Sequence, residues 1–311
     1  MLLPLLMLLA LALPACDLGQ FTVATTAKVL VRAQPALQQE SDYQLAHDAL
    51  PGTLKTIEGF WIVDPDNQDL LKILTEGYCQ YGTAFVEDDW EVAKFAKKLD
   101  EIDSDNARAT HIFTRCLNYA LKQLGEDWQR DLFAAPDVVA KLVKTTGGDR
   151  RDQMMWAALA LGSIINHNLD RMEILVFVPT VQTILNRVLE LDAAKPPDRA
   201  DYAALPHVAF GMLYSAASAQ LGGKPTEARA EFERALKLTA DKDHPDGKLL
   251  LARALLAYRI GVMTNDRKLF HDQLKQVLET PPSVWPEQRL ANEVAHRRAR
   301  RYLSHEKDLF Q

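Results

Sequence analysis

The sequence contains few of the residues that interrupt helices or cross-link a chain. Of its 311 residues, 14 are Gly, 15 are Pro and 3 are Cys. An all-β protein needs many turns and therefore more Gly and Pro, so this composition argues against one. Apolar residues are abundant at 48%, which is enough for one large helical core or two smaller ones.

An excess of positive charge is also missing. The formal net charge at pH 7 is -6, from 36 Lys and Arg against 42 Asp and Glu. Non-specific nucleic-acid binding depends on basic side chains that neutralise phosphates, so this charge balance disfavours it. We therefore expect no nucleic-acid partner.

The motifs that usually carry chemistry are not found in the sequence. There is no nucleophile elbow and no His-Glu-x-x-His zinc motif, and Gly222-Gly223-Lys224 lacks the upstream glycine and the Ser or Thr of a phosphate loop. Residues 241–247 are similar to a calcium loop, but Pro245 takes a ligand position and Ala252 stands where the bidentate Glu belongs. A polar turn is the better interpretation. We expect neither an enzyme nor a cofactor.

Candidate metal ligands and disulfide partners are sparse. The eight His are scattered without a pair at metal-ligand spacing, so no metal site is expected. Cys79 and Cys116 lie on predicted helices about one repeat apart, each among apolar neighbours. This setting favours two free buried thiols. A disulfide is the alternative if the compartment is oxidising.

The chain begins with a short apolar segment that resembles a secretory signal. Residues 1–15 are too short to span a bilayer comfortably and end in small residues. Leu13-Pro14-Ala15-Cys16 is similar to a bacterial lipobox, in which the Cys thiol is acylated and becomes the new N-terminus. We therefore expect lipid anchoring at Cys16, although no basic residue precedes it. A plain signal peptide that happens to contain Cys is the alternative.

Helical periodicity dominates the rest of the chain. Ser41-Asp42 starts a predicted helix that Asp64-Pro65-Asp66-Asn67 separates from the next, over residues 70–86. Glu87-Asp88-Asp89 is then predicted to cap a short helix. Residues 154–165 are apolar on nearly every side, which indicates a central buried helix. No segment is predicted as a strand, so the predicted fold class is all-α.

The most informative stretch is residues 221–238, which match the second half of a tetratricopeptide-type helix pair. Small Ala228 and Ala235 allow a neighbouring helix to approach, while Phe232 and Leu236 fill the space between the two. The pattern predicts an array of helix pairs with a right-handed superhelical twist. We expect a signal peptide at 1–15, a lipid-anchored tether with a first helix at 16–40, and a single helical-repeat domain at 41–311.

Two further features are candidate interaction sites. If a groove holds an apolar ligand, aromatic side chains would line it, and Phe85, Tyr119 and Trp156 are the candidates. The alternative is that all three lie in the core. The basic run Arg297-Arg298-Arg300-Arg301 is interpreted as a solvated face near a helix C-terminus, with contact to an acidic partner or lipid headgroups as the alternative.

A set of short segments occurs in a characteristic order along the chain. Together with the lipobox they are Asp64-Pro65-Asp66-Asn67 with Leu70-Leu71, Tyr81-Gly82-Thr83-Ala84-Phe85-Val86, Arg115-Cys116-Leu117-Asn118-Tyr119-Ala120, Trp156-Ala157-Ala158-Leu159-Ala160-Leu161-Gly162, Val178-Pro179, Leu189-Glu190-Leu191-Asp192, Gly222-Gly223-Lys224-Pro225-Thr226-Glu227-Ala228 and Pro286-Glu287-Gln288-Arg289-Leu290-Ala291-Asn292. Taken together and in this order, they resemble the T-component lipoproteins of TRAP transporters, the tripartite ATP-independent periplasmic transporters. The resemblance implies an all-helical, tetratricopeptide-like lipoprotein that assembles as a trimer. It also implies docking of the transporter's periplasmic substrate-binding protein and shelter for an apolar ligand.

Three functional hypotheses follow. The leading one is a membrane-anchored, periplasm-facing docking module for a TRAP-type substrate-binding protein in the bacterial cell envelope. The second is a generic helical-repeat lipoprotein that acts as a scaffold in envelope assembly. The third is an α/α-toroid enzyme, which would need carboxylates with raised pKa values converging on a cavity. The sequence shows no pair of carboxylates placed in that way.

Overall fold

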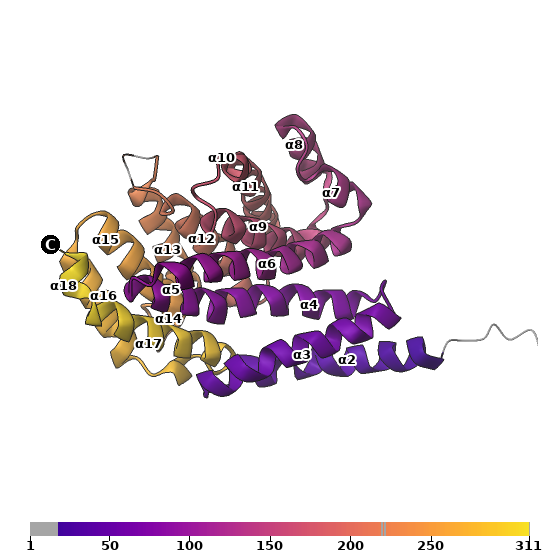
Figure 1. The fold of residues 1–311 in the computed structure, drawn as a ribbon, viewed down its shortest axis with the longest axis horizontal. Coiled ribbons are helices and arrows are strands. Elements are labelled where there is room, and N and C mark those ends of the chain that lie inside the picture. Colours follow the sequence, from indigo (N-terminus) through magenta and orange to yellow (C-terminus); the bar gives the residue numbers. More distant parts are fainter. Residues whose placement is uncertain (1–17, 219, 221, 311) are drawn as a thin grey trace, which may run out of the picture.

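Every regular element of the computed structural model is a helix, as the fold class predicted (Figure 1). The structure describes residues 18–218, 220 and 222–310. The expected signal peptide and Cys16 therefore lie outside the described residues. The first half of the chain forms α2 (Leu18–Gln38), α3 (Tyr43–Val63), α4 (Gln68–Tyr81), η1 (Gly82–Val86), α5 (Glu87–Phe95), α6 (Leu99–Leu124), α7 (Glu126–Asp131), α8 (Pro136–Thr145) and η2 (Gly148–Arg150).

The second half continues in the same way. It forms α9 (Arg151–Asn166), α10 (Met172–Leu175), α11 (Val178–Ala194), α12 (Ala200–Tyr214), α13 (Pro225–Leu238), α14 (Leu250–Leu255), η4 (Leu256–Ile260), α15 (Gly261–Met263), α16 (Arg267–Glu279), η5 (Pro282–Val284), η6 (Pro286–Gln288), α17 (Arg289–Ser304) and α18 (Glu306–Leu309). The segments η1 and η4 are π-helical turns inside longer helices.

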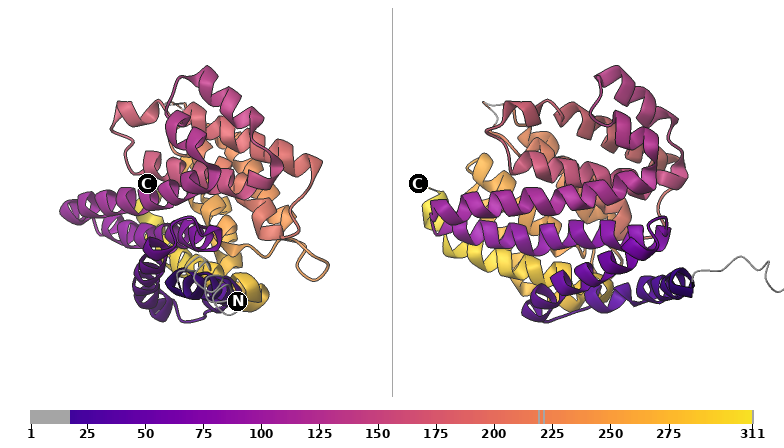
Figure 2. Two further views of the ribbon diagram at one scale, coloured as in Figure 1. Left: turned by 90° about the vertical axis from the view of Figure 1, so that its right-hand side faces the viewer. Right: turned by 45° about the vertical axis from the view of Figure 1, so that its right-hand side comes forward.

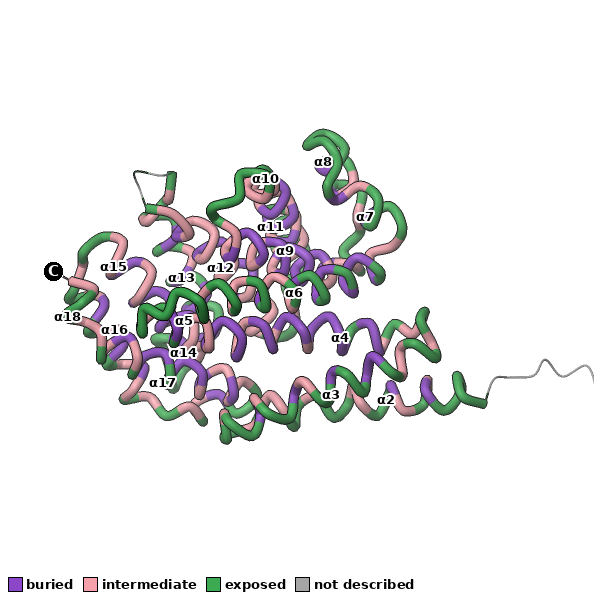
Figure 3. Tube along the Cα trace, viewed as in Figure 1, coloured by how far each residue is buried: buried purple, intermediate pink, exposed green. Residues whose placement is uncertain are grey.

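Long helices that follow one another in the sequence lie side by side. Helix α3 packs on α4, α4 on α6, and α6 on α9, which in turn contacts α11 and α12. Figure 2 shows this layering of antiparallel helices from two further directions. Helix α4 is buried along most of its length, whereas α8 and the start of α2 are exposed (Figure 3).

The segment predicted as a tether with a first helix, residues 16–40, is helical from the first described residue. Helix α2 runs for 21 residues from Leu18, with Val23 and Ala27 as its fully buried positions. The mixture of Thr, Ala and Val in this segment hides the helical period from a hydrophobicity pattern. Its threonines remain compatible with a helix because the hydroxyls of Thr22, Thr25 and Thr26 donate to carbonyls one turn earlier.

Other predicted helix boundaries are confirmed or corrected by local capping. Asp42 caps α3 and Asn67 caps α4, as predicted. Glu87-Asp88-Asp89 caps no new helix, because the chain continues from α4 through the π-turn η1 directly into α5. The three acidic residues therefore lie within one long helical segment, where tertiary partners decide their role.

Helix α13 packs through the small and aromatic side chains that the sequence predicted. In α13, Ala228, Phe232 and Ala235 are fully buried against α12. Helix α12 approaches α13 closely at Gly211, where an added Cβ would lie 2.8 Å from the ring of Phe232. The Phe232 ring therefore fits between the antiparallel helices α12 and α13 only because residue 211 is glycine.

The last long helix returns to the beginning of the chain. Helix α17 packs on α14 and α16 and also contacts α2 and α3, so the series of helices closes on itself (Figure 1). Within the described part, residues 172–194 are long and apolar enough to cross a membrane by length and composition alone. Val181, Ile184, Leu185 and Val188 of that stretch are buried, so its apolar side serves the protein's own core.

Gly211 and Phe232 give a direct test of this packing. Gly211→Ala is expected to lower the free energy of unfolding by about 1–3 kcal/mol, because the buried ring has no room to move. Phe232→Ala should cost about 3–5 kcal/mol through the cavity it leaves. Gly59→Ala in α3 is the matched control, since nothing lies within 4 Å of its added Cβ. Urea denaturation measures all three, and equal midpoints for the two glycine variants would contradict the packing.

Candidate functional site

An apolar cavity of about 260 Å³ lies between the helices. Its walls come mainly from α4 and η1, α9, α12, α14 and α17, and Leu37 and Gln38 at the end of α2 also line it. A concave, mostly apolar cavity with a few polar groups is the usual form of a small-molecule site. The apolar lining includes Leu159, Leu205, Val208, Met212, Leu251 and Val294.

Polar side chains gather at one end of the cavity, where α9 and α12 begin. Trp156 meets the ring of Tyr202 edge to face, with 6.3 Å between ring centroids, and both residues line the cavity. Beside them the amide nitrogen of Gln288 donates to Asp201 at 2.7 Å. The Tyr202 hydroxyl donates to buried Glu76 at 2.8 Å. Burial raises the pKa of the Tyr202 hydroxyl and that of the Glu76 carboxyl, so Tyr202 stays neutral as a donor.

The other end of the cavity is also polar and lies where α9 finishes. Glu87, Asn166 and Arg298 line it. His167, the residue after α9, places its Nε2 3.5 Å from Glu87. The cavity is therefore mostly apolar, with hydrogen-bonding groups near the beginning and near the end of α9. That arrangement suits an apolar molecule that carries a polar group.

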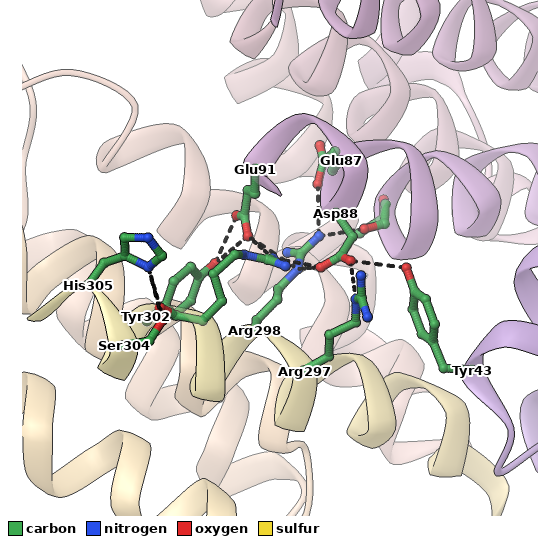
Figure 4. Close-up of polar contacts among 11 residues, drawn as sticks. Tyr43, Glu87, Asp88, Glu91, Arg297, Arg298, Tyr302, Ser304 and His305 are labelled. Atoms are coloured by element: carbon green, nitrogen blue, oxygen red, sulfur yellow. Dashed lines mark hydrogen bonds and ion pairs between the residues drawn. The ribbon is translucent and has the colours of Figure 1, made fainter. Parts of the chain in front are cut away.

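A buried cluster of charges joins this second end to the C-terminal helix (Figure 4). Three acidic residues of α5 face three arginines of α17. Asp88 is completely buried, and it accepts from Arg301 at 2.6 Å and from Arg297 at 2.5 Å. Arg301 also donates to Glu91 at 2.5 Å. The Tyr43 hydroxyl of α3 donates to the same Asp88 at 3.1 Å, so three helices meet at one carboxylate.

Arg298 lies at the centre of the cluster and is 1% exposed. Its guanidinium donates to the Thr83 carbonyl oxygen in η1 at 2.7 Å and stands 3.8 Å from both Glu87 and Glu91. Burial alone would raise the pKa of Asp88, but Arg301 and Arg298 hold that pKa below its usual range. The cluster is therefore charged on both sides.

This cluster corrects the interpretation of the basic run 297–301 as a solvated face. Arg297 and Arg300 are exposed, as predicted, but Arg298 is buried and Arg301 nearly so. The reason is that α17 packs against α5 and α3, whose carboxylates and Tyr43 meet the arginines. The sequence separation of about two hundred residues hides this pairing from any local pattern.

The two thiols expected to be free form a disulfide. Cys79 in α4 and Cys116 in α6 are bonded with 5.4 Å between their Cα atoms. Apolar neighbours are compatible with free thiols and with a disulfide. The antiparallel packing of α4 on α6 decides between them, because it brings the two cysteine side chains together. Cys79 also lines the cavity, so the disulfide forms part of its wall.

The three aromatic candidates for a ligand groove occupy different places. Trp156 lines the cavity. Phe85 packs among Tyr43, His47 and Tyr81, and Tyr119 stacks on Tyr78 while donating to Glu58 at 2.9 Å. The structure thus does not bring the three rings together at one site. That any of them contacts a ligand remains a prediction.

Several cavity residues carry no motif. Tyr202, Leu205, Ala209 and Met212 all come from α12. The one signal in the sequence is that this helix is apolar around its whole circumference, which indicates more than one buried face. Within the described residues, no group of three or more His, Cys, Asp or Glu is placed to hold a metal ion.

The fold and the cavity define an all-helical protein built around a mostly apolar cavity of ligand size. Comparison with protein families makes the assignment specific. The sequence model of the TRAP transporter T-component matches residues 39–310, and the chain belongs to this family. No curated protein matches it.

Membership of this family has direct consequences. The chain is of a transport-associated, non-enzymatic kind, and it is associated with TRAP transporters of the bacterial envelope. The family match covers the cavity helices and the charged cluster alike, since both lie between residues 39 and 310 except for the contribution of α2.

Removing Arg298 tests whether the charged cluster holds the fold together. Arg298→Ala should lower the free energy of unfolding by about 3–5 kcal/mol, because buried carboxylates lose a charged partner. Arg300→Ala, on the exposed side of the same helix, should change it by less than about 0.5 kcal/mol. Urea denaturation of both variants at neutral pH measures the difference. Equal stabilities would show that the cluster contributes nothing specific.

Proposed function

We propose that this protein is a lipid-anchored, periplasm-facing module that docks the substrate-binding protein of a TRAP transporter. In this proposal it holds an apolar ligand, or an apolar part of one, inside its channel. The observation that carries the proposal is the apolar cavity with polar ends in a member of the T-component family. Such a protein binds a ligand and presents it to its partner, and it catalyses no reaction.

The disulfide supports an extracytoplasmic location. Structural disulfides persist in oxidising compartments such as the bacterial periplasm and are rare in the cytosol. The Cys79–Cys116 bond lies between two core helices and fits that setting. It therefore agrees with export directed by residues 1–15 and with anchoring through Cys16, both of which remain proposals.

The helix arrangement supports a docking role. We infer that the helix pairs form a tetratricopeptide-like, right-handed superhelical array with a single repeat domain over 41–311. Arrays of this kind present extended surfaces to partner proteins. Assembly as a trimer, which the family resemblance implies, would place several channels side by side for the substrate-binding protein.

The ligand contacts follow from the cavity walls. Trp156 and Tyr202 supply aromatic surface at one end, and Asp201 and Gln288 supply hydrogen-bonding groups next to them. Glu87, Asn166 and Arg298 would serve a polar group at the other end. Phe85 and Tyr119 would act through the packing of the surrounding core.

Partner capture tests the docking proposal. Full-length tagged protein, cross-linked in its own bacterium and extracted from membranes, should carry acyl chains on Cys16. It should also enrich a periplasmic substrate-binding protein of a TRAP transporter. The variant Cys16→Ser should shift to the soluble fraction and serves as the control for anchoring. Consistent capture of outer-membrane assembly proteins in place of a substrate-binding protein would favour the envelope scaffold and reject docking.

Filling the channel tests the ligand proposal separately. Ala209→Trp places a large side chain in the cavity and should weaken binding of a fluorescent fatty acid roughly tenfold or more. Ala107→Trp, on the exposed face of α6, is the matched control and should bind the probe as the native protein does. Fluorescence titration measures both affinities. Unchanged binding by a folded Ala209→Trp protein would exclude the channel as the site.

A further inference from the structure

Helix α2 has a charge character unlike the rest of the chain. Between Asp17 and Glu40 there is no acidic residue, although the chain as a whole holds 42 Asp and Glu and has a net charge of -6. The charged side chains of α2 are Lys28 and Arg32, and both are exposed. This helix is therefore a local basic segment on an acidic protein.

The outward face of α2 is also unusually apolar. Leu18, Phe21 and Val29 are 76%, 67% and 61% exposed. They fall on one stripe of the helix together with Thr22, Thr25, Lys28 and Arg32, since these positions recur every three or four residues. Val23 and Ala27 on the opposite side are buried against the core. The helix thus has two apolar faces, of which the protein covers one.

The threonines on this helix contribute less polarity than their number suggests. The hydroxyls of Thr22, Thr25 and Thr26 donate to the carbonyl oxygens of Leu18, Phe21 and Thr22 at 2.8–3.0 Å. Each hydroxyl proton is thereby used inside the helix. The exposed stripe is consequently a surface of methyl groups and apolar side chains, with basic groups toward its C-terminal half.

The position of this face in the molecule is equally informative. Leu18 is two residues from Cys16, so their Cα atoms are within about 7 Å of each other. Helices α2 and α3 are antiparallel neighbours, which brings the end of α3 to the start of α2 (Figure 1). At that end of α3, Ile62 and Val63 are 71% and 44% exposed. Exposed apolar residues of both helices therefore lie toward the end of the molecule where α2 begins.

We propose that this face, formed by Leu18, Phe21, Val29, Ile62 and Val63, lies on the lipid surface into which Cys16 is anchored. The inference rests on the proposed anchoring at Cys16. Acyl chains on that residue hold the start of α2 at the headgroup level, where Leu18 and Phe21 enter the acyl boundary. Lys28 and Arg32 then face the phosphates of the headgroups.

A lipid surface fits this face better than a second protein does. Interfacial helices combine an apolar stripe with Lys and Arg, and α2 carries Lys28 and Arg32 and no acidic residue of its own. Only Asp17 separates α2 from Cys16 in the sequence, so an anchor at Cys16 brings the start of this helix to the membrane. The contact would fix how the channel is presented, because a helix lying in the membrane plane removes the freedom that a flexible tether would allow.

Collision accessibility of a spin label tests this contact directly. In the full-length acylated protein Cys16 carries lipid and Cys79–Cys116 are bonded, so one introduced cysteine is the reactive thiol. Phe21→Cys and, separately, Val29→Cys are labelled with a nitroxide and reconstituted in phosphatidylethanolamine–phosphatidylglycerol vesicles. Leu99→Cys is the matched control. Leu99 is 74% exposed and begins α6 at the opposite end of the long helices (Figure 1).

The expected result is a several-fold higher ratio of oxygen to aqueous nickel-chelate collisions at Phe21 and Val29 than at Leu99. Water-like ratios at both α2 positions in acylated protein would overturn the inference and leave the anchor intact. Shielding from both reagents without vesicles would show a protein partner on this face and would also overturn it. Mass spectrometry of the same sample reports acylation of Cys16. Absence of acylation at Cys16 would reject both the anchor and this inference. The partner-capture experiment would then still test the docking proposal.

Discussion

The structure depends on a buried set of opposite charges that fastens the last long helix to an early one. Asp88, Glu91 and Glu87 on α5 meet Arg297, Arg298 and Arg301 on α17, and Tyr43 adds α3 to the group. Five of these charged side chains are largely removed from water, while Arg297 stays partly exposed. Their desolvation is costly, and the cost is offset because each carboxylate accepts from, or lies against, a guanidinium. The pKa of Asp88 is lowered, so its contribution to stability is present above about pH 4 and is lost as the pH falls through its folded pKa. We infer that these charges select one position of α17 against α5, which apolar packing alone would define less sharply.

The closed arrangement of the helices leaves the apolar cavity between them. With α17 fastened to α5 and in contact with α2 and α3, the helices α4, α9, α12 and α14 surround a space that their own side chains do not fill. Arg298 is part of both the charged cluster and the cavity wall, because it lies against Glu91 and also lines one end of the cavity. Stability and the candidate binding site are therefore coupled through one side chain. The family's association with transport supports our proposal that this cavity holds an apolar molecule.

Local patterns in the sequence predicted what local physics determines. The helices, the caps at Asp42 and Asn67, and the buried Ala228–Phe232–Ala235 face follow from periodicity and turn chemistry. The same local rules assigned Glu87-Asp88-Asp89 to a helix cap and Arg298 to solvent, because their true partners lie about two hundred residues away. The free-thiol interpretation of Cys79 and Cys116 was wrong for a related reason, since only the register of α4 on α6 decides that they meet. No sequence motif predicts the cavity, because it is a space left between packed helices.

A double-mutant cycle on Asp88 and Arg301 tests the central claim most directly. Their atoms are 2.6 Å apart, and they join helices from opposite ends of the chain. Urea denaturation of Asp88→Asn, Arg301→Gln and the double variant should give a favourable coupling of about 1–3 kcal/mol, because each single change leaves a buried charge without its partner. A coupling below about 0.5 kcal/mol would mean that the two residues act independently, and it would contradict a closure that depends on their charges.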